Sequence, residues 1–194
     1  MSSFEEAWDA CRFDDIETLK TLVPSKVDPN TCAHSDDNHL NTLLCACSSH
    51  GARECAAYLI DSGALVKAKN HAGFNALHWA AYSGRLECVG LLLEAKIGIE
   101  SKTEDGRTAL HIAAERGHFA FVKAILEKKA DINAVNSVGW SAVRLALVTN
   151  QRIVIDFLIE NGCDYKQMDY EKKKIDATAK EFKRDWFIKK YLDA

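Results

Sequence analysis

The chain has 194 residues, a formal net charge of −3 and seven cysteines. A slightly acidic balance argues against a protein that binds nucleic acid by general electrostatic attraction. No apolar run approaches the ~18 residues that a membrane span requires, so we expect no membrane insertion. Residues 1–6 lack the basic and apolar parts of a secretory signal.

The first predicted element is a pair of short helices over residues 4–23. Each has one apolar stripe at helical spacing, made by Phe4, Ala7, Trp8 and Cys11 in the first helix and by Ile16, Leu19, Leu22 and Val23 in the second. The opposite face is strongly acidic. That polarity is typical of the end repeat of a stack, which has no neighbour on one side.

A polar segment follows at residues 32–41 and predicts a surface loop. It begins a group of zinc-ligand residue types, Cys32, His34, His39, Cys45 and Cys47. The spacing does not fit a usual zinc finger. The last two cysteines are two residues apart on a predicted helix, so their side chains point about 200° apart. We therefore predict no metal site and no other cofactor.

The rest of the chain repeats with a period of 33 residues. Helix-capping residue types recur at Thr42, Asn75, Thr108 and Ser141. Nine residues after each cap stands a residue that tolerates the left-handed conformation, namely Gly51, Gly84, Gly117 and Asn150. Five residues after each cap stands a small residue, namely Cys47, Ala80, Ala113 and Ala146. Each repeat thus predicts a helix, a turn and a second helix that needs neighbours to bury its apolar side.

The first repeat and the last fit this register less closely. Aligning Ala10 with Cys47 places the cap of the first helix at Glu5 and leaves about four additional residues in the loop at 32–41. At the other end, Ala179 takes the small-residue place, and the following helix carries a basic face, which predicts a carboxy-terminal cap.

This pattern resembles the ankyrin repeat, whose signature begins Thr-Pro-Leu-His-x-Ala. The segments Asn75-Ala-Leu-His-Trp-Ala80 and Thr108-Ala-Leu-His-Ile-Ala113 match it well. The resemblance implies an all-α ankyrin-repeat solenoid of stacked helix-turn-helix units with hairpin-like tips, about six repeats including two caps. We expect one domain over residues 1–194. Its parts would be an amino-terminal cap and loop at 1–37, repeats at 38–70, 71–103, 104–136 and 137–169, and a carboxy-terminal cap at 170–194.

No arrangement of residues predicts catalysis. The sequence lacks a phosphate-binding glycine loop, a Gly-x-Ser-x-Gly elbow and a His-Glu-x-x-His motif, so we predict that the protein is not an enzyme. His78 and His111 occupy the signature histidine position, where the resemblance implies hydrogen bonds between neighbouring turns.

The resemblance also implies a binding surface on the turn tips and on the exposed side of each first helix. Mapping those columns gives a candidate set of partner-binding residues: Lys69, His71, Phe74, Tyr82, Lys102, Glu104, Asp105, Arg107, Glu115, Arg116, Val135, Ser137, Val138 and Trp140. Apolar side chains at tip positions are not needed for folding, and together with a central arginine they are typical of binding hot spots. The alternative is that Trp140 packs onto the next repeat. Trp79, within a first helix, is expected to pack rather than bind.

The sequence therefore predicts a protein–protein interaction module, an adaptor or inhibitor that holds a protein or peptide partner. The alternative is a scaffold or chaperone-like subunit of a larger assembly. Buried cysteines at packing positions indicate a reducing compartment, so we expect the cytoplasm, with the nucleus possible. We expect a monomer in the absence of the partner.

Overall fold

The computed structural model describes residues 2–33, 41–166 and 173–193. It consists of two compact units, an amino-terminal unit over residues 1–104 and a carboxy-terminal unit over residues 105–194. The boundary lies next to a predicted repeat boundary. The single domain expected over residues 1–194 stays a prediction.

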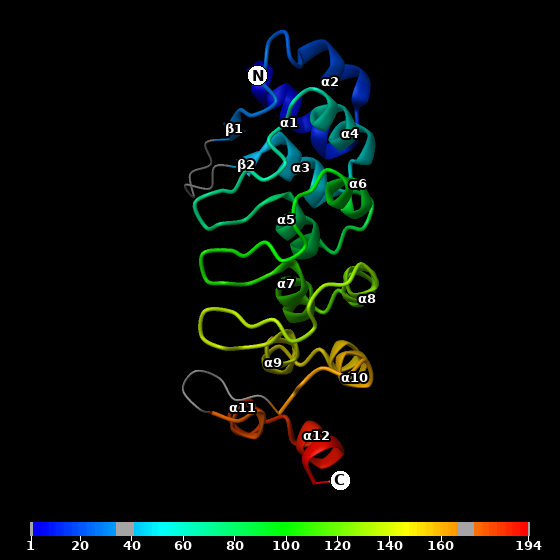
Figure 1. The fold of residues 1–194 in the computed structure, drawn as a ribbon. Helices are drawn as coiled ribbons and strands as arrows, with labels where there is room; N and C mark the ends of the chain where they lie inside the picture. The colour runs from blue at the N-terminus through cyan, green and yellow to red at the C-terminus, as the bar shows by residue number, and fades with distance from the viewer. Residues whose placement is uncertain (1, 34–40, 167–172, 194) are drawn as a thin grey trace. The chain divides into compact units, whose positions relative to one another are not determined.

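The amino-terminal unit has two layers of helices (Figure 1). The inner layer contains α1 (Ser3–Phe13), α3 (Leu43–His50) and α5 (Ala76–Ser83), and the outer layer contains α2 (Ile16–Leu22), α4 (Arg53–Asp61) and α6 (Val89–Glu94). Two short strands, β1 (Cys32–Ala33) and β2 (Asn41–Thr42), pair antiparallel, with Cys32 opposite Thr42. The paired strand β2 leads directly into α3.

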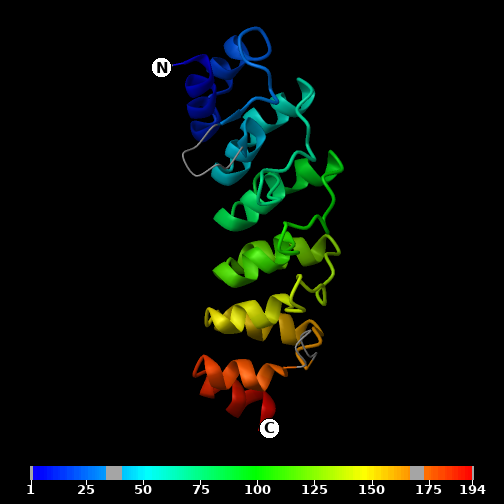
Figure 2. The same ribbon diagram turned by 90° about the vertical axis from the view of Figure 1, so that its left-hand side faces the viewer.

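The carboxy-terminal unit repeats the arrangement, as Figure 2 also shows from the side. Its inner helices are α7 (Ala109–Arg116), α9 (Ala142–Val148) and α11 (Ile175–Glu181), and its outer helices are α8 (Phe119–Glu127), α10 (Arg152–Glu160) and α12 (Asp185–Phe187). A π-helical turn over Ile188–Leu192 continues α12. The all-α ankyrin-type fold predicted from the sequence is confirmed.

The predicted cap and stop residues set the ends of the inner helices. Asn75 caps α5 by accepting a hydrogen bond from the His78 amide at 3.1 Å. Gly84 and Gly117 end α5 and α7 with φ of +70° and +76°, and Asn150 follows α9 with φ of +64°. These are left-handed conformations, which glycine and asparagine adopt at the lowest cost.

The predicted cap of the first helix was wrong by three residues. α1 begins after Ser2, whose hydroxyl accepts from the Glu5 amide, and the Glu5 carboxylate accepts from the Ser2 amide at 2.7 Å. This reciprocal capping box favours an earlier start. Glu5 is therefore the third helical residue rather than the cap.

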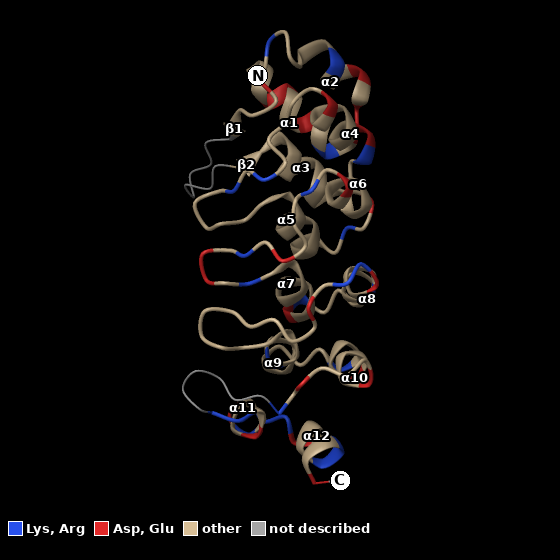
Figure 3. Ribbon diagram, in the orientation of Figure 1, with Lys and Arg blue, Asp and Glu red and all other residues tan. Residues whose placement is uncertain are grey.

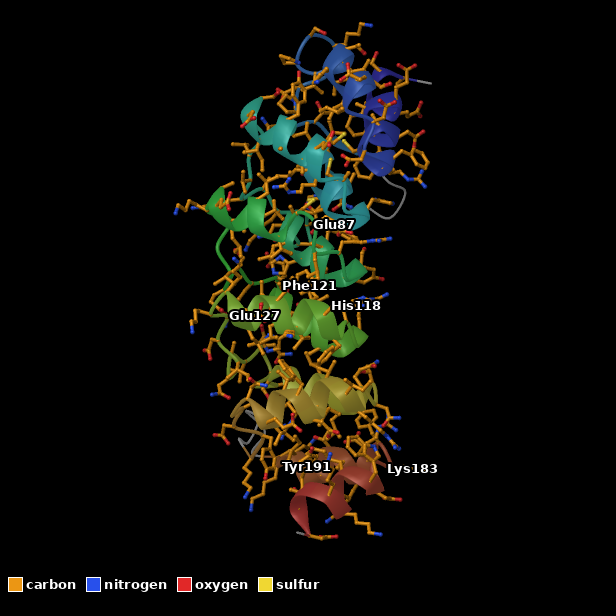
Figure 4. All side chains as sticks on the ribbon, turned by 90° about the vertical axis from the view of Figure 1, so that its right-hand side faces the viewer. Glu87, His118, Phe121, Glu127, Lys183 and Tyr191 are labelled. Atoms are coloured by element: carbon orange, nitrogen blue, oxygen red, sulfur yellow. The ribbon has the colours of Figure 1, made fainter. Side chains whose placement is uncertain are left out.

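The core lies between the inner and outer helices of each unit. The small residues Cys47, Ala80, Ala113 and Ala146 are fully buried, so the two helices of each repeat approach closely there. In the carboxy-terminal unit Phe121 of α8, labelled in Figure 4, is fully buried and fills the space beside the inner helix. The predicted column of small side chains is thus confirmed.

Candidate partner-binding tips

Two turn tips, the segments just before inner helices α5 and α9, are each built around a buried asparagine. In the amino-terminal unit the Asn70 Oδ1 accepts hydrogen bonds from the amides of Ala72 and Phe74, at 3.0 and 2.9 Å. The Asn136 Oδ1 does the same for Val138 and Trp140, at 3.1 and 2.9 Å. In each of these two turns one side chain therefore fixes the backbone of the tip.

Glycine lets neighbouring tips approach closely. Gly73 and Gly106 have φ of +77° and +78°, and a Cβ at either position would lie 2.6 Å from the backbone nitrogen of the next tip. That nitrogen belongs to Glu104 beside Gly73 and to Ser137 beside Gly106. The Glu104 amide donates to the Ala72 carbonyl at 3.1 Å, and the Ser137 amide donates to the Asp105 carbonyl at 3.0 Å. Tips within each unit are thus hydrogen-bonded to one another.

The signature histidines join each inner helix to the following turn, as predicted. The His78 ring, fully buried, lies 2.9 Å from the Ser101 carbonyl through Nε2, and its Nδ1 accepts from the Asn75 amide at 3.2 Å. The Nε2 of His111 lies 3.0 Å from the Trp140 carbonyl. Arg144 takes the same place in α9 and donates to the Lys173 carbonyl at 2.7 Å. These groups are structural, and they set the position of the tip backbone.

In the amino-terminal unit the predicted binding residues fall into two kinds. Four are exposed at the tips, namely Lys69, His71, Lys102 and Glu104. The Lys69 ammonium donates to the Lys102 carbonyl at 2.7 Å, so it also stabilises the next tip. Phe74 is half-buried against the Trp79 ring at a centroid distance of 5.5 Å, and Tyr82, 39% exposed, packs against the same ring edge-on, also at 5.5 Å.

In the carboxy-terminal unit Arg107, the central arginine of the predicted set, is held by two carboxylates. Its guanidinium forms ion pairs with Asp105 at 2.6 Å and with Glu115 at 2.9 Å, and its side chain is only 25% exposed. It therefore links the tip to helix α7. Arg116 is exposed at the end of that helix.

The tip after α8 carries the apolar residues. Val138 is 54% exposed, Ser137 is exposed, and Val135 and Trp140 are half-buried. Val135 forms a β-bridge with Ser141, which closes the base of the turn. The backbone of this turn is held by hydrogen bonds from Asn136 and His111, and not by the apolar side chains that it carries. The use of these tip residues in binding stays a prediction.

A comparison with protein-family models matches the description "Ankyrin repeats (3 copies)" to residues 7–103 and 95–169. The chain belongs to the ankyrin-repeat family. Ankyrin repeats generally mediate protein–protein interaction, and the fold is typically a non-catalytic interaction module. A comparison with curated proteins finds no match for this chain.

This ankyrin-repeat protein has a hollow that the sequence did not predict. It lies on the inner helices of the amino-terminal unit, has a volume of about 110 Å³, and is lined by Trp8, Asn41, Cys45, Ala46, Ser49 and Trp79. We call it the tryptophan notch. Trp79 packs against Phe74 and Tyr82 as expected, and its ring also forms a wall of this hollow.

One sequence signal could have indicated the notch. Ala46 and Trp79 occupy equivalent positions in successive repeats, 33 residues apart. A small residue at one position and a large ring at the next leave space beside the ring. The position of Trp8 could not be predicted in the same way. The four additional residues between the first two repeats disturb the register through which α1 would be aligned.

The cysteine and histidine group considered as a zinc site is only partly described. His34 and His39 lie outside the described residues. In the parts of the chain that the structure describes, no three His, Cys, Asp or Glu side chains gather as metal ligands would. Burial raises the pKa of the Cys45 thiol to about 11, which favours its protonated form.

Two further features concern the surface. A hollow of about 450 Å³ lies in the carboxy-terminal cap, with a mixed lining of Lys166, Lys174, Lys180, Ile175, Ile188 and Leu192 among others. Among the described helices, none has both the length and the apolar character needed to cross a membrane.

Proposed function

We propose that this protein is a non-catalytic adaptor or inhibitor that holds a protein or peptide partner on its turn tips and inner helices. The observation that carries the proposal is the tip at Val138 and Trp140. Large apolar side chains stand there, exposed or half-buried, on a backbone fixed by Asn136 and His111. Apolar groups that folding does not require are a feature of interaction surfaces.

The fixed backbone favours tight binding. A partner that docks on a flexible loop must order it, at a cost of roughly 0.5–1.5 kcal/mol for each immobilised side chain. Here the Asn136 amide oxygen already holds the turn through two hydrogen bonds. The binding free energy of Trp140 would therefore be opposed by little loss of backbone entropy.

The charges beside this tip favour a partner with polar groups around an apolar anchor. Arg107 is oriented by Asp105 on the tip and Glu115 on α7. An arginine held between two carboxylates has a fixed orientation, so the charge at this place on the surface is well defined. Such a polar rim around aromatic anchors is typical of specific interfaces.

We further propose that the protein works in a reducing compartment, the cytoplasm or the nucleus. The support is chemical: six of the seven cysteines are buried free thiols and Cys32 is half-buried. Thiols in packing positions serve as small apolar side chains and form no disulfide framework.

The test begins with a pull-down by the full chain from source lysate, followed by titration of the purified partner. Trp140→Ala should weaken binding by about 2 kcal/mol or more, the cost expected for a hot-spot tryptophan. Phe119→Ala is the matched control, since Phe119 is a partly exposed aromatic residue on outer helix α8, and it should leave affinity unchanged.

Two results would contradict the proposal. If Trp140→Ala lowers the melting temperature strongly and leaves binding intact, Trp140 is a packing residue. If the chain instead elutes in a stable multi-subunit complex that survives the substitution, a scaffold role is the better account.

A further inference from the structure

The tryptophan notch differs from the tip site in position and chemistry. Its walls are two indoles, from α1 and α5, and its floor is the small-residue surface of α3. From these features we infer that the notch is a subsite for a cationic side chain, lysine or arginine, of a bound peptide segment. This inference rests on the proposed function, because it names the chemistry of one part of a partner.

Both indoles are held in place without a ligand. The Trp79 Nε1 donates to the Asn41 Oδ1 at 2.9 Å, and its ring packs against those of Phe74 and Tyr82, each at a centroid distance of 5.5 Å. The Trp8 ring packs on Phe4 at a centroid distance of 5.9 Å. A hollow with fixed aromatic walls binds without first paying the entropy of ordering them.

The polar groups of the notch already have partners. The Asn41 Oδ1 also accepts from Asn70 at 3.0 Å, and the Ser49 hydroxyl donates to the Ala46 carbonyl at 3.0 Å. An occupant is therefore recognised by the two indoles and an apolar floor. The unbranched stems of lysine and arginine suit such a floor, and their cations are attracted to the face of tryptophan.

The surrounding charge selects a cation over a neutral apolar side chain. Helices α3 and α5 contain no Lys, Arg, Asp or Glu, as Figure 3 shows, whereas α1 carries Glu5, Glu6 and Asp9 against a single Arg12. Glu5 stands three residues before Trp8, on the same side of α1.

Arg12, four residues after Trp8, shares that side of α1 and is the residue that could compete for the notch. Its guanidinium instead contacts Asp9 at 3.2 Å and lies over the Phe13 ring at 5.5 Å. The Arg12 guanidinium is thus held by Asp9 and Phe13 and does not occupy the notch. The net negative charge of α1 favours the binding of a cationic side chain from a partner.

The test uses two peptides that differ only in charge, acetyl-Gly-Lys-Gly-amide and the same peptide with norleucine in place of lysine. The four tryptophan indole N–H signals in a nitrogen–proton NMR spectrum report binding. We expect the lysine peptide to shift the signals of Trp8 and Trp79 and to bind about fivefold or more tightly than the norleucine peptide, as a cation attracted to two indoles should. The preference should decrease in ~1 M salt, where charges are screened.

A substitution on the floor of the notch tests whether the peptide binds there. Ala46→Leu should place a larger side chain in the notch and abolish the shifts, whereas Ala177→Leu, at an exposed site on α11, should preserve them. If Ala46→Leu loses its helical circular dichroism, Trp8→Leu replaces it, since this change removes one indole wall.

Equal affinity for the two peptides would overturn the inference, as would unchanged Trp8 and Trp79 signals or full binding by a folded Ala46→Leu variant. Failure here is distinguishable from failure of the tip site. Trp140→Ala should weaken the binding of the partner and leave the affinity for the lysine peptide unaffected. A lysine peptide that fails to bind would overturn the inference about the notch, but it would not change the expected effect of Trp140→Ala on partner binding.

Discussion

His111 is the residue through which stability and partner binding should be most directly coupled. Its Nδ1 accepts from the Thr108 amide at 3.3 Å, and its Nε2 lies 3.0 Å from the Trp140 carbonyl. A carbonyl is only an acceptor, so the neutral ring carries its proton on Nε2. His111→Leu keeps a buried side chain of similar size but can make neither hydrogen bond.

The cost follows from the two buried groups of Thr108 that lose their acceptor, its amide at 3.3 Å and its hydroxyl at 2.9 Å from the His111 Nδ1, whereas the Trp140 carbonyl keeps the hydrogen bond from the Asn136 amide at 3.0 Å. A buried group left without a hydrogen bond costs roughly 1–3 kcal/mol, so the two together give about 2–6 kcal/mol. This is a large part of the roughly 5–15 kcal/mol that a folded domain possesses. The tip that carries Trp140 should also become less fixed, and partner affinity should decrease.

Urea unfolding followed by circular dichroism measures the change in the free energy of unfolding. The matched control is His71→Leu, at an exposed tip position, which should change that free energy by no more than about 0.5 kcal/mol. If His111→Leu unfolds at the same urea concentration as the original protein, the histidine does not hold the tip. The account of how inner helices fix the turns would then be wrong.

Two other predictions concern charge. Arg107→Ala should lower the free energy of unfolding by about 1 kcal/mol, since two partly exposed ion pairs are lost; an unchanged urea midpoint would show that these pairs contribute nothing. Burial raises the pKa of Cys88 to about 12 and that of Cys45 to about 11, above the ordinary thiol value of 9.0. Their contribution to stability is complete below pH 9 and is lost as pH rises toward 11–12, so the urea midpoint should be constant to about pH 9 and then decrease. A midpoint that stays constant to pH 11 would contradict this.

The repeat register could be predicted because it depends on local chemistry. Helix starts at Thr42 and Asn75 and stops at Gly84 and Gly117 are decided by a few neighbouring residues. The small residue at Ala113 is likewise fixed by the close approach of two helices that are adjacent in sequence. These signals recur every 33 residues, so each repeat supports the assignment of the others.

The candidate site could be predicted only in outline. The columns identified which residues stand at the tips, but not that Arg107 reaches Glu115, eight residues along the chain, because side-chain direction decides that contact. The start of α1 depended on competition between Ser2 and Glu5 as capping residues. The tryptophan notch could not be predicted, because Trp8 lies in the irregular first repeat and the 33-residue period does not place it relative to Trp79.

The central claim is that the tips, and not the outer helices, bind the partner. Val138 and Ile153 test it as a pair, because both are exposed aliphatic residues, 54% and 70% exposed, one on a tip and the other on outer helix α10. Titration of the purified partner should show that Val138→Asp weakens binding about tenfold or more, since an apolar contact is replaced by a charge, while Ile153→Asp leaves affinity unchanged. Equal affinities for the two variants, or a loss confined to Ile153→Asp, would contradict the account.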